Sequence, residues 1–184
     1  RKAIVAAMWD LIRGSPMRFV FILDPLDSLK AHKDTSLAIM REAAQRGHEL
    51  FVSMQGDLLL RQDKVRLITR SFEFTQGASW HHLSEATETS PGDFDAVLMR
   101  KDPPFDNEFL YSTYLLELAA EQGALILNNP QSVRDWNEKL SVARFPQFAP
   151  EFLVTSNNDL IRSFLAEHGD IVVKPLDGMG GSSV

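Results

Sequence analysis

The most informative stretch of the sequence is Ile171-Val-Val-Lys-Pro-Leu-Asp-Gly-Met-Gly-Gly-Ser-Ser-Val184. Its first three residues are apolar and predict a short strand that ends at a lysine. The residues after Asp177 contain too many glycines for a helix or a strand, so we expect a flexible loop. Glycines allow backbone amides to point into one concavity, and serine hydroxyls add donors, which together suit phosphate oxygens. The candidate nucleotide-binding residues of this stretch are Lys174, Gly178, Gly180, Gly181, Ser182 and Ser183.

The position of the lysine relative to the glycines distinguishes the motifs to which this stretch could belong. A surface hairpin beside an unrelated lysine is the simplest alternative. A P-loop requires its lysine after the glycines, whereas Lys174 precedes them, and a dinucleotide-binding fingerprint should lie early in the chain between a first strand and its helix. Both of these motifs are excluded. A lysine on a strand followed by a glycine-rich flap resembles the nucleotide site of ATP-grasp ligases.

The composition is that of an ordinary globular protein. The 184 residues are 44% hydrophobic and 24% charged, which is sufficient for one domain, or one domain and part of another. The net charge of -6 argues against nonspecific binding to nucleic acid or to anionic lipid. Cysteine is absent, which excludes disulfides and thiolate chemistry, and no apolar run is long enough to cross a membrane. We therefore expect a cytoplasmic protein with small-molecule partners.

Strand and helix patterns alternate along the chain from Met17. This alternation predicts an α/β fold with an open, mostly parallel sheet flanked by helices. A hairpin is predicted within residues 57–70, and residues 80–90 are too polar to assign. Strands are predicted at 18–23, 48–54, 94–99, 125–127 and 171–173, and helices at 35–46, 107–122, 132–140 and 157–168.

Polar residues follow several of the predicted strands. Ligands of open parallel sheets bind outside the carboxyl ends of the strands, so residues 24–34, 100–106 and 128–137 are expected to converge on one cleft. Arg100 and Lys101 would favour a carboxylate, with each sheltered contact contributing about 1.5–3 kcal/mol. The alternative is that both cations pair with Asp102 and Asp106 on the surface. The five histidines have no metal-binding spacing, and no Gly-x-Ser-x-Gly motif indicates a serine hydrolase.

Six segments, in order, resemble the N-terminal portion of the prokaryotic glutathione synthetase family of ATP-grasp ligases. The resemblance extends from Met17 to Val184, and its most specific parts are the strings at 99–106 and 174–181. Residues 1–16 have no counterpart in the family. The six segments are Asp24-Pro25, Lys33-Asp-Thr-Ser36, Met99-Arg-Lys-Asp-Pro-Pro-Phe-Asp106, Asn129-Pro-Gln-Ser132, Asn137-Glu-Lys-Leu140 and Lys174-Pro-Leu-Asp-Gly-Met-Gly-Gly181.

The resemblance implies ATP-dependent ligation of γ-glutamylcysteine to glycine through an acyl phosphate. Lys139 and Lys174 correspond to two ATP-binding lysines of the family, where positive charge would hold the phosphates. On its own pattern, Lys139 would instead be an exposed helical lysine. The glycine-rich loop would close over the phosphates and exclude water. Arg100, Lys33 and Ser36 are the candidates for binding the peptide substrate.

The resemblance also divides the chain into parts. We expect an N-terminal extension at 1–16, which could be a leader, an upstream extension or a cloning remnant. A Rossmann-like pre-ATP-grasp domain is expected at 17–140, and the beginning of an ATP-grasp domain at 141–184. ATP and Mg²⁺, or alternatively Mn²⁺, are the implied cofactors, but no metal ligand or certain catalytic residue is expected before Val184. The chain alone is therefore expected to be inactive.

Two other functions fit the same residues. One is a different ATP-grasp carboxylate–amine ligase, such as a ribosomal-modification glutamate ligase or a D-alanine ligase. The other is a non-catalytic domain that binds a small molecule in the strand-end cleft. The family resemblance further implies a homo-oligomer, commonly a tetramer.

Overall fold

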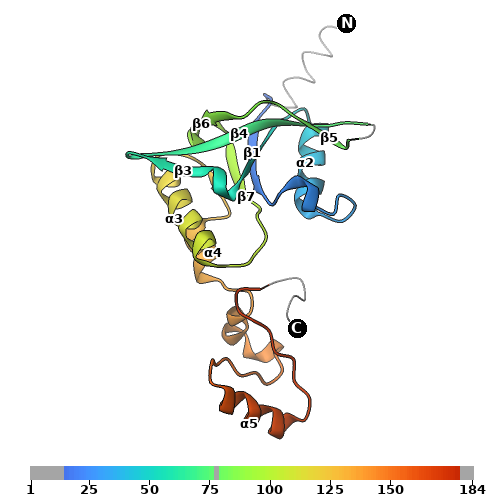
Figure 1. The fold of residues 1–184 in the computed structure, drawn as a ribbon, viewed down its shortest axis with the longest axis vertical. Coiled ribbons are helices and arrows are strands. Elements are labelled where there is room, and N and C mark those ends of the chain that lie inside the picture. The colour runs from blue at the N-terminus through green and yellow to red at the C-terminus, as the bar shows by residue number, and fades with distance from the viewer. Residues whose placement is uncertain (1–14, 77–78, 179–184) are drawn as a thin grey trace, which may run out of the picture.

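The computed structural model describes residues 15–76 and 79–178, which form two lobes (Figure 1). The upper lobe in the figure contains a sheet with helices on both sides, and the lower lobe contains the C-terminal helix α5 and its flanking segments. In the described part of the chain, no helix is both long and apolar enough to span a membrane.

The strands of the upper lobe are short except for one. They are β1 (Arg18–Leu23), β2 (Glu49–Met54), β3 (Leu58–Arg61), β4 (Lys64–Phe74), β5 (His81–Leu83), β6 (Thr87–Thr89), β7 (Ala96–Met99) and β8 (Ile126–Leu127). The α-helices are α2 (Thr35–Gln45), α3 (Asn107–Glu121), α4 (Pro130–Asp135) and α5 (Asn158–His168). The short 3₁₀ turns η4 (Leu140–Arg144) and η5 (Pro146–Phe148) lie between α4 and α5.

The sheet has a parallel part and an antiparallel part. Strand order is β3-β4-β2-β1-β7-β8, in which β1 pairs parallel with β2 and β7, and β7 pairs parallel with β8. Strand β4 pairs antiparallel with β2, β3, β5 and β6. The predicted α/β class with a parallel sheet between helices is confirmed, and the antiparallel strands are an addition at one side of the parallel part.

The alternation of side chains along β1 distributes its apolar residues to two cores. Val20 and Ile22 belong to the core on the side of α3, together with Leu116. Phe21 and Leu23 belong to the core on the side of α2, together with Leu37 and Met40 of that helix. Because successive residues of a strand point to opposite faces, a continuous apolar run such as 19–23 indicates a sheet covered on both sides. Figure 1 shows α2 and α3 on opposite sides of β1.

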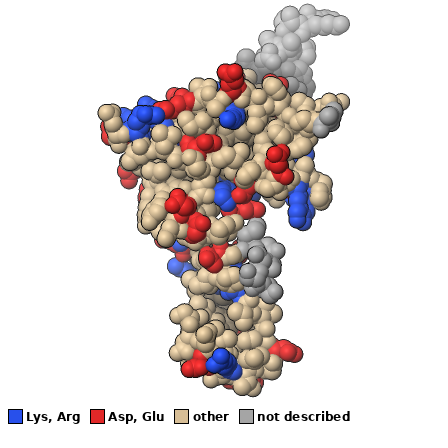
Figure 2. Space-filling view, viewed as in Figure 1, with Lys and Arg blue, Asp and Glu red and all other residues tan. Residues whose placement is uncertain are grey.

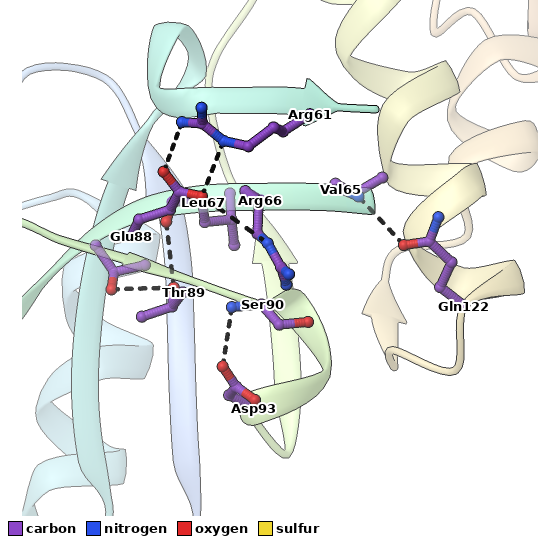
Figure 3. A network of polar contacts seen from close by, with 10 residues as sticks. Arg61, Val65, Arg66, Leu67, Glu88, Thr89, Ser90, Asp93 and Gln122 are labelled. Atoms are coloured by element: carbon purple, nitrogen blue, oxygen red, sulfur yellow. Dashed lines mark hydrogen bonds and ion pairs between the residues drawn. The ribbon is translucent and has the colours of Figure 1, made fainter. Parts of the chain in front are cut away.

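The antiparallel side of the sheet is fastened by polar contacts (Figure 3). Glu88 of β6 accepts hydrogen bonds from Arg61 of β3, at 2.8 Å for the shorter one, and also lies 3.9 Å from Arg66. Gln122, at the end of α3, accepts from the Val65 backbone amide and donates to the Asp63 carbonyl oxygen. The hairpin of β3 and β4 is thus held both by β6 and by α3.

The lower lobe is organised differently, because none of its residues from 140 to 178 is buried. Its α5 begins at the cap residue Asn157 and ends at Gly169, whose positive φ of 80° suits glycine. Large apolar side chains are exposed throughout the lobe: Phe148 is 83% exposed and Val172 is 69% exposed. In the view of Figure 2, few charged side chains cover this lobe above its lower end.

Most predicted elements are confirmed within one or two residues. The exceptions lie in the second half of the chain. The helix predicted at 132–140 is confirmed only in its first part, because α4 spans Pro130–Asp135 and the Asn137 side chain accepts from the backbone amides of the next turn. The strand predicted at 171–173 is wrong, because no described segment pairs with it. Residues 80–90, left unassigned by sequence, contain β5 and β6.

Candidate functional site

The carboxyl ends of β1 and β7 meet in a cluster of charged residues. Asp24, which follows β1, forms a 2.8 Å ion pair with the Lys101 ammonium group through Oδ1 and accepts a 2.8 Å hydrogen bond from the Asp102 backbone amide through Oδ2. The side chains of Lys101 and Asp24 are only 18% and 22% exposed, so water screens the pair less than it screens a surface pair. Two of the three segments predicted to converge, 24–34 and 100–106, are therefore joined, and these contacts do not include the third segment, 128–137.

Arg100 is oriented by a residue in the first turn of α2. Its backbone amide continues the β1–β7 pairing by donating to the Ile22 carbonyl oxygen, and its Nε donates to the buried Ser36 Oγ at 3.1 Å. Ser36 lies in the first turn of α2, which Asp34 caps by accepting from the Leu37 amide. No ion pair to Arg100 is found within the described residues. The Nε edge of the Arg100 guanidinium group is thus held by Ser36, and the positive charge of the group is available to an anion.

The surface-pairing alternative for Arg100 and Lys101 is wrong. Lys101 forms its ion pair with Asp24, and Asp106 caps α3 by accepting from the Phe109 amide at 2.9 Å. Desolvation by burial, followed by repulsion from the carboxylates of Asp24 and Asp34, raises the pKa of Asp102 above its ordinary value, and Arg100 and Lys101 only partly offset this.

The second candidate site lies where the two lobes join. Lys139 reaches across from the α4–η4 turn, and its ammonium group donates to the Gly178 carbonyl oxygen and lies 2.8 Å from the Glu138 carboxylate. The Lys139 side chain is 18% exposed, so it is sheltered rather than extended into solvent as a helical surface lysine would be. The structure therefore brings together two nucleotide-binding candidates, Lys139 and Gly178, that are 39 residues apart.

The other predicted site residues are placed less tightly or lie beyond the described ranges. Lys174 and Lys33 are exposed, and neither has a side-chain hydrogen bond or ion pair within residues 15–76 and 79–178. In the same part of the chain, no three His, Asp or Glu side chains gather as a metal ion would require. The candidates Gly180, Gly181, Ser182 and Ser183 lie outside the described residues.

Sequence reasoning missed two participants in these sites. Asp24 belongs to one of the six family-like segments but was given no role, although its position directly after a buried strand was the available signal. Asn137 likewise was given no role, and its contacts across the lobes depend on residues 39 positions away. A pairing over such a separation leaves no periodic trace in the sequence.

Two protein-family models match this chain, and the one that covers its C-terminal part defines the class of protein. The model described as "Prokaryotic glutathione synthetase, ATP-grasp domain" matches residues 138–184, so the part of the chain that contains Lys139 and the glycine-rich stretch has the features of an ATP-grasp ligase. The model described as "Prokaryotic glutathione synthetase, N-terminal domain" matches residues 17–134. The chain belongs to the prokaryotic glutathione synthetase family.

Individual members of this family are similar to the chain over most of its length. The chain is 51% identical over 172 residues to a glutathione synthetase of Nitrosomonas europaea, covering 91% of this chain and 54% of that protein. It is 48% identical over 164 residues to one of Yersinia pestis, covering 89% of this chain and 51% of that protein. The identity to one of Salmonella typhi is 47% over 164 residues, covering 89% and 52%. The chain spans about half the length of these curated relatives.

Proposed function

We propose that the protein containing this chain is an ATP-dependent ligase that joins γ-glutamylcysteine to glycine. The cysteinyl carboxylate of the dipeptide attacks the γ-phosphorus of ATP, which forms an acyl phosphate and releases ADP. The glycine amine then attacks the acyl carbon, phosphate leaves, and the amine loses a proton. The observation that best supports this proposal is the contact between Lys139 and Gly178, because it places a sheltered cation at the start of the glycine-rich stretch.

The nucleotide is proposed to bind between the lobes. Lys139 would attract the phosphates, with Lys174 as a second cation from the exposed segment before the glycines. Gly178, Gly180, Gly181, Ser182 and Ser183 are proposed to supply backbone and hydroxyl donors. In the structure, Lys139 donates to a carbonyl oxygen and pairs with the exposed carboxylate of Glu138, so phosphate oxygens would replace weaker partners.

The dipeptide is proposed to bind at the strand-end cluster. Arg100 has the geometry for a carboxylate, because its Nε is fixed by Ser36 and the rest of its guanidinium group is not held in an ion pair by the described residues. Lys101 is a weaker candidate, since Asp24 already neutralises it. Lys33 stays a proposed substrate residue on the exposed turn before α2. Within the cluster, Ser36 orients Arg100.

Mg²⁺ is proposed as the second cofactor, with Mn²⁺ as an alternative. When bound, such an ion would neutralise phosphate charge during transfer. The described residues offer no group of three metal-ligating side chains, so this chain's contribution to the reaction is derived only from its cations and backbone groups. The protein is further proposed to be cytoplasmic and homo-oligomeric, with a tetramer as the form to test by native mass spectrometry.

The test is a steady-state assay of the full-length protein with ATP, Mg²⁺, γ-glutamylcysteine and glycine. We expect glutathione and ADP in equal amounts. When glutamate or D-alanine is supplied in place of both γ-glutamylcysteine and glycine, ADP release should stay at background. Equal turnover with D-alanine alone, or with glutamate, would instead assign the protein to another carboxylate–amine ligation.

Two variants separate the proposed sites. Arg100→Ala should raise the KM for γ-glutamylcysteine by about 10- to 100-fold, because a charge-assisted contact is worth about 1.5–3 kcal/mol. Lys139→Ala should raise the KM for ATP by a similar factor. Arg46→Ala is the matched control, since Arg46 forms an exposed pair with Glu42 on α2 and should change neither KM. An Arg100→Ala protein with only its KM for ATP altered would refute the substrate assignment.

A further inference from the structure

Three successive carbonyl oxygens fix the backbone just before the glycine-rich stretch. The Leu176 oxygen accepts from the Asn137 side-chain amide at 3.0 Å, the Asp177 oxygen accepts from the Phe105 backbone amide at 2.9 Å, and the Gly178 oxygen accepts from the Lys139 ammonium group. The donors come from two different loops of the upper lobe. The segment 176–178 is therefore docked through its own backbone.

Asn137 has a special place in this docking because both ends of its side-chain amide are used. Its Oδ1 accepts from the backbone amides of Lys139 at 3.0 Å and Leu140 at 3.1 Å, while its Nδ2 donates to the Leu176 oxygen. One side requires an acceptor and the other requires a donor, so the orientation of the amide is fixed by its partners. An aspartate at this position could accept from the Lys139 and Leu140 amides but could not donate to the Leu176 oxygen.

The same residue also fixes the turn that carries Lys139. The Asn137 carbonyl oxygen accepts from the Ser141 hydroxyl at 2.6 Å and from the Ser141 backbone amide at 2.9 Å. Asn137 thus holds the backbone of Lys139, which lies two residues further along the chain. Asn137 also binds the Leu176 carbonyl oxygen, and Leu176 lies two residues before Gly178, the residue that the Lys139 ammonium group contacts. Asn137 connects both ends of the Lys139–Gly178 contact.

The docking also sets the direction of backbone donors. In a trans peptide the carbonyl of one residue and the amide of the next point in opposite directions. With the Leu176 and Asp177 oxygens held toward the upper lobe, the amides of Asp177 and Gly178 point away from it. These donors are thereby oriented before any ligand arrives, which reduces the ordering that binding requires.

We propose that Asn137 is a positioning residue for the nucleotide: it holds Lys139 and the backbone amides at the start of the glycine-rich stretch in one arrangement. This inference rests on the proposed nucleotide site. It predicts that the loss of the Asn137 side-chain amide weakens nucleotide binding through Lys139, without changing the strand-end cluster.

The experiment measures binding of a non-hydrolysable ATP analogue with Mg²⁺ to the full-length protein by titration calorimetry. Asn137→Asp keeps the acceptor for Lys139 and Leu140 but removes the donor to Leu176, whereas Asn137→Ala removes both and adds no charge. Each should raise Kd by about 5- to 10-fold, as expected for losing a hydrogen bond that organises the site. Asn157→Asp, the same chemical change at the cap of α5, should leave Kd unchanged.

A double-mutant cycle measures the coupling between Asn137 and Lys139 in nucleotide binding, and a purely structural residue would show no such coupling. If Asn137 acts through Lys139, Asn137→Ala should have much less effect in a Lys139→Ala background than alone. Additive effects, or a rise in Kd for Asn137→Asp but not for Asn137→Ala, would overturn the proposal, the latter because the added charge would then account for the whole effect. If Lys139→Ala itself binds normally, the nucleotide site fails, and the Asn137 proposal fails with it.

The melting temperature and the KM for γ-glutamylcysteine are the controls that detect misfolding of the variants. Both should stay near the unmodified values in the Asn137 variants. A general loss of stability accompanied by equal increases in both KM values would show that Asn137 supports the fold rather than the nucleotide site.

Discussion

Helices α2 and α5 are both 11 residues long and both begin at a side-chain cap, Asp34 in one and Asn157 in the other. They differ in what they bury. Leu37 of α2 is fully buried against the sheet, whereas α5 has no buried residue and its Leu165 is 43% exposed. Local signals therefore suffice to define where a helix begins and ends, while the contribution of the helix to stability depends on a partner surface.

The largest expected difference follows from truncating one leucine in each helix. In the 184-residue chain, Leu37→Ala should lower the free energy of unfolding by about 3 kcal/mol, because it removes buried methyl groups and leaves a cavity. Leu165→Ala should lower it by less than about 1 kcal/mol, since the side chain already contacts water. Urea denaturation followed by circular dichroism provides both values. Similar losses would mean that α5 is as well packed as α2.

A second comparison concerns arginines in the two lobes. Arg134 of α4 lies over the Tyr114 ring, donates to the buried Thr113 hydroxyl and pairs with Glu117 of α3. Arg134→Ala should cost about 1–3 kcal/mol because Glu117 loses a partner in a partly buried position. Arg162→Ala on α5 should cost less than about 0.5 kcal/mol, since its pair with Asp159 is exposed. Thermal unfolding of both variants checks this order, and a reversed order would contradict it.

The smallest effect is expected at the strand-end cluster and depends on pH. The pKa of Asp102 is raised above its ordinary value of 3.8 in the folded protein, so protonation of Asp102 favours folding and this contribution is lost as pH rises through the folded-state pKa. Asp102→Asn should therefore raise the melting temperature slightly at pH 7. The gain should disappear as pH approaches 3.8. A gain that stayed constant with pH would exclude this electrostatic cause.

The elements that could be predicted from the sequence are those whose signals are local. Periodicity and caps located α2, α3 and α5, and the apolar run 19–23 correctly indicated a strand covered on both faces. Strands β5 and β6 were missed because they are short and polar, and they exist through pairing with β4. The run 171–173 has strand composition, but a strand also needs a neighbour to satisfy its backbone groups.

The candidate sites follow the same division. Arg100 could be named because it follows a strand, yet its orientation by Ser36 joins residues 64 positions apart. Lys139 could be named only through resemblance to a family, since an isolated helical lysine has the same pattern. Its contact with Gly178 and the role of Asn137 arise from how the two lobes meet.

Strand β4 also governs how the sheet ends. Without it, the six-residue β2 would leave a row of unpaired backbone groups along one side of the parallel part. Strand β4 covers part of β2 and is itself bordered by β3, β5 and β6, which are four, three and three residues long, while β8 at the other side has two. Such short borders offer another polypeptide little template for intermolecular pairing. The arrangement therefore protects the upper lobe against edge-to-edge aggregation while the protein is being made.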